Sequence, residues 1–201
     1  IWHGEQTTAY VAVYQKLDGT LGAQPYQTPV KVGETSNHFS FSNLPQYVGG
    51  KVATYEVYEV ISDGHSGWTK VESGSKIELN GKDYQVSYDG ANVVNTELMD
   101  IPVTKTWIDG ESADRPGSVT IALYQNDQKV GNEVNLTAAA NWKYTFQDLP
   151  KYDEDGDLYT YKVYEMNGDQ KVENNGTIGD YTVTYAGENQ RNITHKLTDI
   201  D

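Results

Sequence analysis

The sequence contains no cysteine, and only 15 of its 201 residues are lysine or arginine. The missing cysteines exclude disulfide bonds, thiolate metal sites and a cysteine nucleophile. Because 29 residues are aspartate or glutamate, the formal net charge is −14, and no basic surface is available to neutralise phosphates. No apolar run reaches the roughly 20 residues that a membrane helix needs, and no signal-peptide pattern opens the chain at Ile1. We therefore expect no nucleic-acid partner and no membrane insertion.

Tyrosine and glycine are abundant, with 16 and 19 residues, whereas methionine occurs only twice. Most segments alternate polar and apolar side chains over four to eight residues and are rich in Val, Tyr and Thr, which is typical of half-buried strands. Asn-Gly and Asp-Gly pairs separate these segments as turns. No amphipathic helix of ten residues is evident, and residues 137–140 (TAAA) are the only helix-prone patch. This composition predicts an all-β protein.

The chain contains an internal repeat. The matching segments are 10–14 with 120–124, 39–47 with 144–152, 55–60 with 161–166, and 84–88 with 181–185. Trp2 matches Trp107 at the front of each copy. Because the matches occur in the same order, we interpret the chain as two tandem copies, residues 1–100 and 101–201.

Each copy of about 100 residues with several short strands predicts a β-sandwich. The joint between the copies, residues 96–102 (TELMDIP), lacks a Gly/Ser run, and Pro102 favours an extended backbone at Ile101. A short, stiff joint between two sandwiches predicts a rod.

Strand alternation places several polar side chains on inward faces, because residues two apart in a strand share a face. In the second copy these are Lys105, Glu165 and His195, and in the first copy they are Glu59 and Asn95. A buried lysine or glutamate destabilises a protein unless it is paired. The convergence of such groups therefore indicates a site.

Several motifs of the second copy together resemble the collagen-adhesin B-type (Cna B-type) repeat. They are VTKTW at 103–107, Arg115-Pro116, W-x-Y-x-F at 142–146, LPKYD at 149–153 and YTYKVYE at 159–165. The likeness covers residues 101–197 and, with weaker motifs, residues 1–98. It implies two tandem Ig-like or prealbumin-like β-sandwiches from a surface adhesin or pilin of a Gram-positive bacterium.

The resemblance also implies a self-made lysine–asparagine isopeptide bond assisted by a glutamate. Burial would lower the lysine pKa and raise the glutamate pKa, so that a neutral amine attacks a polarised carboxamide. The matching positions in the second copy are Lys105, Glu165 and His195, but imidazole has no acyl group to attack. The first copy supplies Glu59 and Asn95, whereas its lysine position precedes Ile1, so its first strand is truncated. We therefore predict that neither copy is cross-linked, and that the second holds a buried ionic cluster.

Two other features are candidate sites of a different kind. The alternate carboxylates of Asp153, Asp155 and Asp157 suit calcium, but Leu158 stands where an EF-hand loop needs glycine. We therefore expect a solvated acidic turn, with no metal and no cofactor. Trp68 and Trp142 do not repeat between the copies, which makes them candidates for contact with a ligand.

The four histidines lie in none of the motifs of known hydrolases or metalloenzymes, so we expect no enzyme activity. The resemblance implies a monomeric stalk that projects a binding domain, with neighbouring repeats as partners, on an extracellular surface with its wall anchor outside this sequence. The alternative is that one repeat itself binds a host matrix protein or a glycan.

Overall fold

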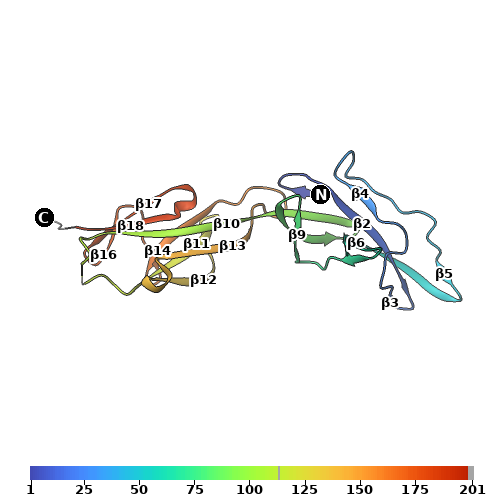
Figure 1. Cartoon of the computed structure of the whole chain (residues 1–201), viewed down its shortest axis with the longest axis horizontal. Coiled ribbons are helices and arrows are strands. Elements are labelled where there is room, and N and C mark those ends of the chain that lie inside the picture. The colour runs from blue at the N-terminus through green and yellow to red at the C-terminus, as the bar shows by residue number, and fades with distance from the viewer. Residues whose placement is uncertain (113, 199–201) are drawn as a thin grey trace. The chain divides into compact units, whose positions relative to one another are not determined.

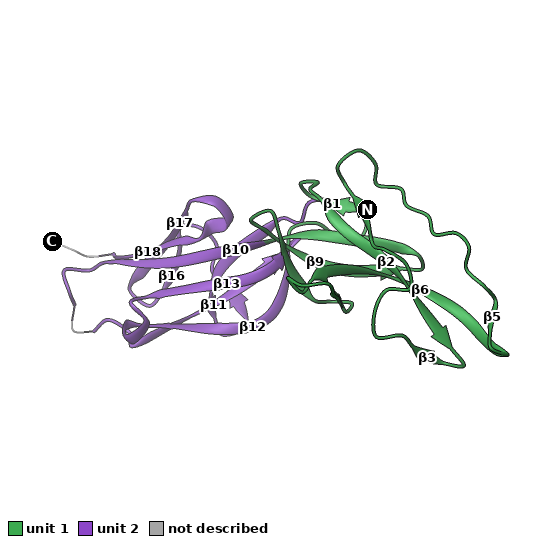
Figure 2. Cartoon of the chain, turned by 45° about the vertical axis from the view of Figure 1, so that its right-hand side comes forward, with its two compact units in different colours: residues 1–98, 150–157 green, residues 99–149, 158–201 purple. Residues whose placement is uncertain are grey.

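The computed structural model describes residues 1–112 and 114–198, and it confirms the all-β prediction. Its only described helices are the short 3₁₀ segments η1 (Ala138–Ala140) and η2 (Glu188–Gln190), and η1 is the helix-prone patch seen in the sequence. The chain divides into two compact units (Figure 2). Unit 1 comprises Ile1–Leu98 with Pro150–Asp157, and unit 2 comprises Met99–Leu149 with Leu158–Asp201.

Unit 1 contains two sheets, and most of its strands are labelled in Figure 1. One sheet is built from β8 (Lys76–Leu79), β9 (Lys82–Asp89), the first part of β10 (Asn92–Ile108), and β1 (Trp2–His3). The other has β2 (Ala9–Leu17) and β6 (Lys51–Ser62) at its centre. Around that centre lie β3 (Thr20–Leu21), β4 (Val30–Val32), β5 (Tyr47–Val48) and β7 (Trp68–Lys70).

Unit 2 repeats this plan. One sheet contains the second part of β10 with β18 (Asn192–Leu197), β17 (Tyr181–Ala186), β16 (Gly176–Ile178) and β13 (Lys143–Pro150). The other has the order β12 (Gln128–Thr137), β11 (Ser118–Gln125), β14 (Tyr161–Asn167) and β15 (Gln170–Lys171). The predicted joint, residues 96–102, lies inside the continuous strand β10.

The core of each unit comes from the inward residues of facing strands. In unit 2, Ile121 and Val163 are fully buried in the main core, and their neighbours Ala122 and Tyr164, which point to the opposite face, are buried as well. In unit 1, Val11 packs in the main core, but Ala12 and Tyr14 on the opposite face of β2 are also buried. The centre of β2 is therefore buried on both faces, whereas the sequence predicts a half-buried strand.

The loop Pro150–Asp157 packs with unit 1, although the sequence places it in the second copy. The Lys151 N–H donates to the carbonyl oxygen of Glu97 at 2.9 Å, and the Lys151 ammonium lies 3.4 Å from the Glu97 carboxylate. These contacts join residues 54 positions apart in the chain. The compact units therefore differ from the sequence copies in this loop and at residues 99–100, which lie in unit 2.

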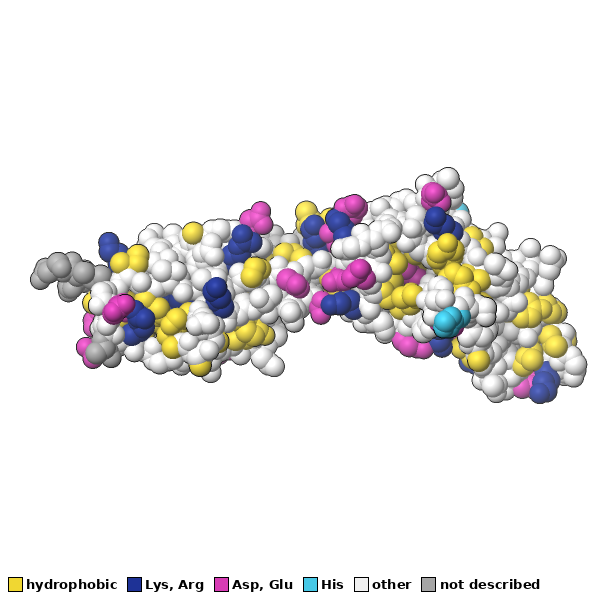
Figure 3. All heavy atoms as spheres, in the orientation of Figure 1, with side chains coloured by type: hydrophobic (Ala, Val, Ile, Leu, Met, Phe, Trp, Pro, Cys, Tyr) yellow, Lys and Arg dark blue, Asp and Glu magenta, His cyan; other side chains and the backbone are white. Residues whose placement is uncertain are grey.

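Charged side chains of both signs are interspersed on the surface of both units in the face shown in Figure 3. Across residues 1–112 and 114–198, neither helix has the length or the apolarity to cross a bilayer.

Candidate functional site

Three polar side chains from three strands of unit 2 meet in its core. Lys105 comes from β10, Glu165 from β14 in the facing sheet, and His195 from β18. All three are buried. The Lys105 ammonium lies 3.4 Å from Glu165 Oε2, and His195 Nε2 contacts the same carboxylate oxygen. The structure therefore brings together the three residues that strand alternation places on inward faces.

Burial dominates the electrostatics of this cluster. Removal of the ammonium from water lowers the pKa of Lys105 to about 8, and the neighbouring Glu165 carboxylate opposes that shift. The Lys105 ammonium also lies over the Trp107 ring, 4.4 Å from its centroid. The His195 ring meets Trp107 edge to face at 4.8 Å. Trp107 thus covers both nitrogen-bearing side chains of the cluster.

The side chains of Arg115, Asp109 and Tyr181 hold Trp107 in place. Arg115 donates from Nε to Asp109 Oδ2 at 2.8 Å and lies 5.1 Å from the Trp107 ring centroid. The Tyr181 hydroxyl contacts the same carboxylate at 3.2 Å. The Arg115 guanidinium holds the pKa of Asp109 at about 2, so this carboxylate stays ionised at neutral pH.

Unit 1 holds a simpler version of this site. Glu59 on β6 is buried, and Asn95 Nδ2 lies 3.5 Å from its Oε1. Within the described structure, Glu59 Oε2 and Asn95 Oδ1 have no hydrogen-bond partner. Both residues line a small cavity of about 20 Å³. Burial raises the pKa of Glu59 to about 7, although the Asn95 hydrogen bond opposes that shift.

The two sites occupy the same position in the backbone. In unit 2, β10 and β18 are parallel, with Trp107 opposite His195 and Lys105 opposite Ile193. In unit 1, β1 and β10 are parallel, with Trp2 opposite Asn95. The position equivalent to Lys105 therefore lies one residue before Ile1, as the sequence alignment predicts.

One tyrosine in each unit fixes the glutamate strand, and neither is among the site residues predicted from the sequence. The Tyr185 hydroxyl accepts from the Glu165 N–H at 2.9 Å and donates to the Val172 carbonyl at 2.7 Å. Tyr88 makes the same two bonds in unit 1, to the Glu59 N–H at 3.0 Å and the Val71 carbonyl at 2.7 Å. The repeated Y-x-V-x-Y motif was the signal that could have identified them.

Residues 101–196 of this chain match the model of the Cna protein B-type domain family. Residues 101–196 are therefore a Cna B-type domain. Over 209 aligned residues it is 30% identical to a collagen adhesin of Staphylococcus aureus. That alignment covers 98% of this chain and 15% of the adhesin, so the chain spans a small part of this curated relative.

Two solved structures show the fold of the relatives. A single B repeat (B1) of the S. aureus collagen-binding surface protein is 21% identical, with a TM-score of 0.43 over 97% of this chain and all of that one. The pilus backbone of Streptococcus pneumoniae is 15% identical, with a TM-score of 0.31 over 96% of this chain and 75% of that one.

The two tryptophans predicted to contact a ligand, Trp68 and Trp142, are packed against neighbouring rings. Trp68 lies 5.0 Å from the Tyr10 ring, and Trp142 meets Trp107 edge to face at 5.1 Å. In unit 1, Asn37 contacts Trp2 and so takes the place of Trp142. Both indoles are half-buried, and their contact with a ligand stays a prediction.

In the acidic loop, the Asp153 carboxylate binds backbone N–H groups. Asp153 Oδ1 accepts from the N–H groups of Asp155 at 2.9 Å and Asp157 at 2.8 Å. Among residues 1–112 and 114–198, no group of three or more histidines or carboxylates has the arrangement of a metal site. The two backbone hydrogen bonds make Asp153 the residue that holds this turn.

Proposed function

We propose that this chain is a pair of tandem Cna B-type stalk repeats, residues 1–100 and 101–201, from a surface adhesin or pilin of a Gram-positive bacterium. Its role is structural: it projects a binding domain from the cell wall, to which the protein is anchored outside this sequence. It acts as a monomer whose partners are the neighbouring repeats, and it has no catalytic turnover.

The observation that carries this proposal is the parallel pairing of the first and last strands in each unit. Parallel neighbours run in the same direction, so the start of the first strand and the end of the last lie at opposite ends of the pair. β10 and β18 pair in this way in unit 2, and β1 and β10 in unit 1. Tension between the ends of such a unit loads this pairing in shear, over five registered residue pairs in unit 2 and two in unit 1.

We further propose that neither unit carries an isopeptide bond within this chain. In unit 2 the residue at the acyl position is His195, so the Lys105 amine has no carbonyl carbon to attack. Lys105, Glu165 and His195 instead form an ionic cluster. In unit 1 the equivalent amine position is absent from this sequence. An intact-mass measurement tests this: the expected mass is the full sequence mass, and loss of one ammonia would overturn the proposal.

The stalk role is tested by fusing one, two and three copies of the chain end to end. Small-angle X-ray scattering then gives the maximum dimension of each monomeric product. A stalk predicts a constant increment in this dimension with each added copy. A dimension that grows much more slowly than the number of copies would overturn the role as a spacer.

A second candidate function is an adhesive module that binds a host matrix protein or a glycan. It is favoured by one observation, a cavity of about 570 Å³ in unit 1. This volume lies within the roughly 300–1,000 Å³ of small-molecule sites.

A further inference from the structure

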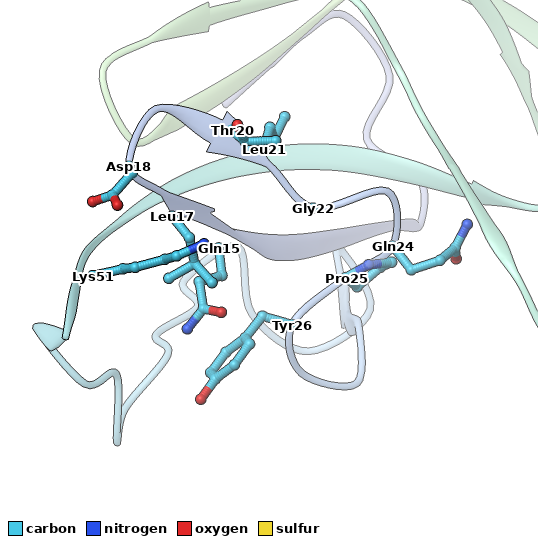
Figure 4. Close-up of a pocket in the computed structure, with 10 residues that line it drawn as sticks. All are labelled: Gln15, Leu17, Asp18, Thr20, Leu21, Gly22, Gln24, Pro25, Tyr26 and Lys51. Carbon is cyan, nitrogen blue, oxygen red and sulfur yellow. The ribbon is translucent and has the colours of Figure 1, made fainter. Parts of the chain in front are cut away.

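The cavity of unit 1 lies where an edge strand leaves its sheet (Figure 4). In unit 2, the strand β12 pairs with β11 from Thr137 to Gln128. In unit 1 the corresponding partner of β2 is split into β3 and β4, and residues 22–29 lie between them. This segment stays attached through Tyr26 N–H, which donates to the Val13 carbonyl at 2.8 Å. Residues 22–29 form one wall of the cavity.

A cation lines the cavity without an ion pair. Lys51 begins β6 beside the turn of Gly49 and Gly50, whose φ values of 55° and 79° suit a tight hairpin. Alternation puts Lys51 on the same strand face as Tyr55 and the buried Glu59. In Figure 4 its side chain reaches across toward β2, where Gln15 and Leu17 line the cavity. The Lys51 ammonium has no ion pair with any described residue.

The aromatic side chain of Tyr26 forms the wall of the cavity beside Lys51. The Tyr26 side chain lines the cavity, and this residue is 40% exposed. Its ring packs on Tyr55 at 5.7 Å between centroids. The Tyr55 hydroxyl is held in turn by Gln15 Nε2 at 3.1 Å and by the Pro45 carbonyl at 2.7 Å. Tyr26 therefore packs on a side chain that is already held in place, so little conformational entropy is lost when a flat molecule packs on it.

The rim supplies an anion that balances the cation. Asp18 Oδ1 accepts from the Val52 N–H at 3.1 Å, which leaves the second carboxylate oxygen for a ligand. The amide oxygen of Gln15 is a further acceptor, and the Thr20 hydroxyl both donates and accepts. The cavity thus offers donors and acceptors together, and the formal charges of Asp18 and Lys51 sum to zero.

We propose that this cavity binds a neutral oligosaccharide. Sugar hydroxyls donate and accept at once, which matches the mixed polar groups, and the C–H face of a pyranose can pack on Tyr26. A purely apolar ligand would bury Lys51 and Asp18 without partners. A polyanion would be repelled by the net charge of −14. The proposal rests on the second candidate function, and its failure leaves the stalk role untouched.

The test uses the full chain on an array of neutral di- to hexasaccharides printed beside sialylated and sulfated ones. The strongest neutral glycan is then titrated in solution by NMR. Tyr26→Ala is expected to weaken binding at least about tenfold, whereas Tyr26→Phe retains most of it. Lys51→Met is expected to weaken binding several-fold. Tyr47→Ala is the matched control, because Tyr47 is 67% exposed and lies outside the cavity lining.

Binding of neutral glycans that Tyr26→Ala abolishes and Tyr47→Ala leaves intact supports the proposal, provided that both variants unfold at the temperature of the parent chain. Affinity for a neutral glycan should change little with salt, because no net charge is neutralised. Three results would overturn the proposal: no binding to any neutral glycan, binding to sulfated or sialylated glycans only, or binding that Tyr26→Ala leaves unchanged.

Discussion

Trp107 stands opposite His195 in the parallel pairing of β10 and β18, and the centroids of the two rings lie 4.8 Å apart. The corresponding pair in unit 1 is Trp2 and Asn95. One backbone register thus presents an imidazole in unit 2 and a carboxamide in unit 1. This single difference determines which chemistry is open to Lys105.

The substitution His195→Asn should give unit 2 a carboxamide beside Lys105 and Glu165. We expect Lys105 Nζ to attack the new amide carbon, so that a C–N bond forms and ammonia leaves with the proton lost by the amine. Intact mass should fall by one ammonia. Closure of a loop of about 90 residues should add roughly 4–5 kcal/mol to the free energy of unfolding.

The control for that experiment is His195→Asn combined with Lys105→Met, which removes the amine and should keep the full mass. An unchanged mass in the single variant, with native far-UV circular dichroism, would contradict the assigned geometry.

The substitution Glu165→Ala should leave Lys105 and His195 buried without their shared carboxylate. Loss of one partner of a buried ionic group typically costs about 3–5 kcal/mol of unfolding free energy. The triple variant Lys105→Met, Glu165→Met, His195→Leu removes all three ionisable side chains and should cost less than the single change. Urea denaturation measures both, and a triple variant less stable than Glu165→Ala would count against the ionic description.

Glu59 should make unit 1 less stable as pH rises. Its pKa is about 7 when folded and 4.5 in the reference state, so between these values the folded chain holds a proton that the unfolded chain has lost. Unfolding free energy therefore falls through this window, by at most roughly 3 kcal/mol. The measurement is urea denaturation at pH 4.5 to 7.5. Glu59→Gln should flatten that part of the profile, and an identical slope in both proteins would refute the assignment.

Tyr185→Phe and Tyr88→Phe should destabilise their units by similar amounts. Each change removes one hydroxyl that bonds a glutamate N–H and a valine carbonyl, and leaves these backbone groups without that partner. The expected cost is about 1–3 kcal/mol in each unit, measured by thermal or chemical unfolding. A loss in one unit only would mean that the two sites are not equivalent in energy.

The sequence predicted the strands, the repeat and the convergence of Lys105, Glu165 and His195, because alternation with period two decides which face a residue occupies. The same rule placed Glu59 and Asn95. These predictions rest on local patterns, and local patterns are visible in a single sequence.

Other features depend on contacts that no local pattern reports. The packing of Lys151 against Glu97 joins residues 54 positions apart, so no local pattern reports that the loop at 150–157 packs with unit 1. The cavity beside Tyr26 exists because the edge strand leaves its sheet, which depends on how residues 22–29 pack. The Arg115-Pro116 motif likewise does not report that the Arg115 guanidinium lies over the Trp107 ring.

The missing cysteines make mechanical experiments straightforward, because introduced thiols are the only attachment points. Pulling on the two ends of the chain loads the parallel pairs β1–β10 and β10–β18 in shear. A matched control pulls on Asp180→Cys and Thr198→Cys, which lie side by side at one end of the antiparallel pair β17–β18. That geometry opens hydrogen bonds one after another and should yield at much lower force.

Single-molecule force spectroscopy on the end-pulled chain tests the central claim most directly. Two stalk repeats without internal cross-links predict two unfolding steps at forces well above the control. Each step should lengthen the chain by on the order of 300 Å, since roughly 90 residues extend by about 3.4 Å each. Unfolding at the force of the control would contradict the stalk role, and a missing or much shorter step would contradict the absence of an isopeptide bond.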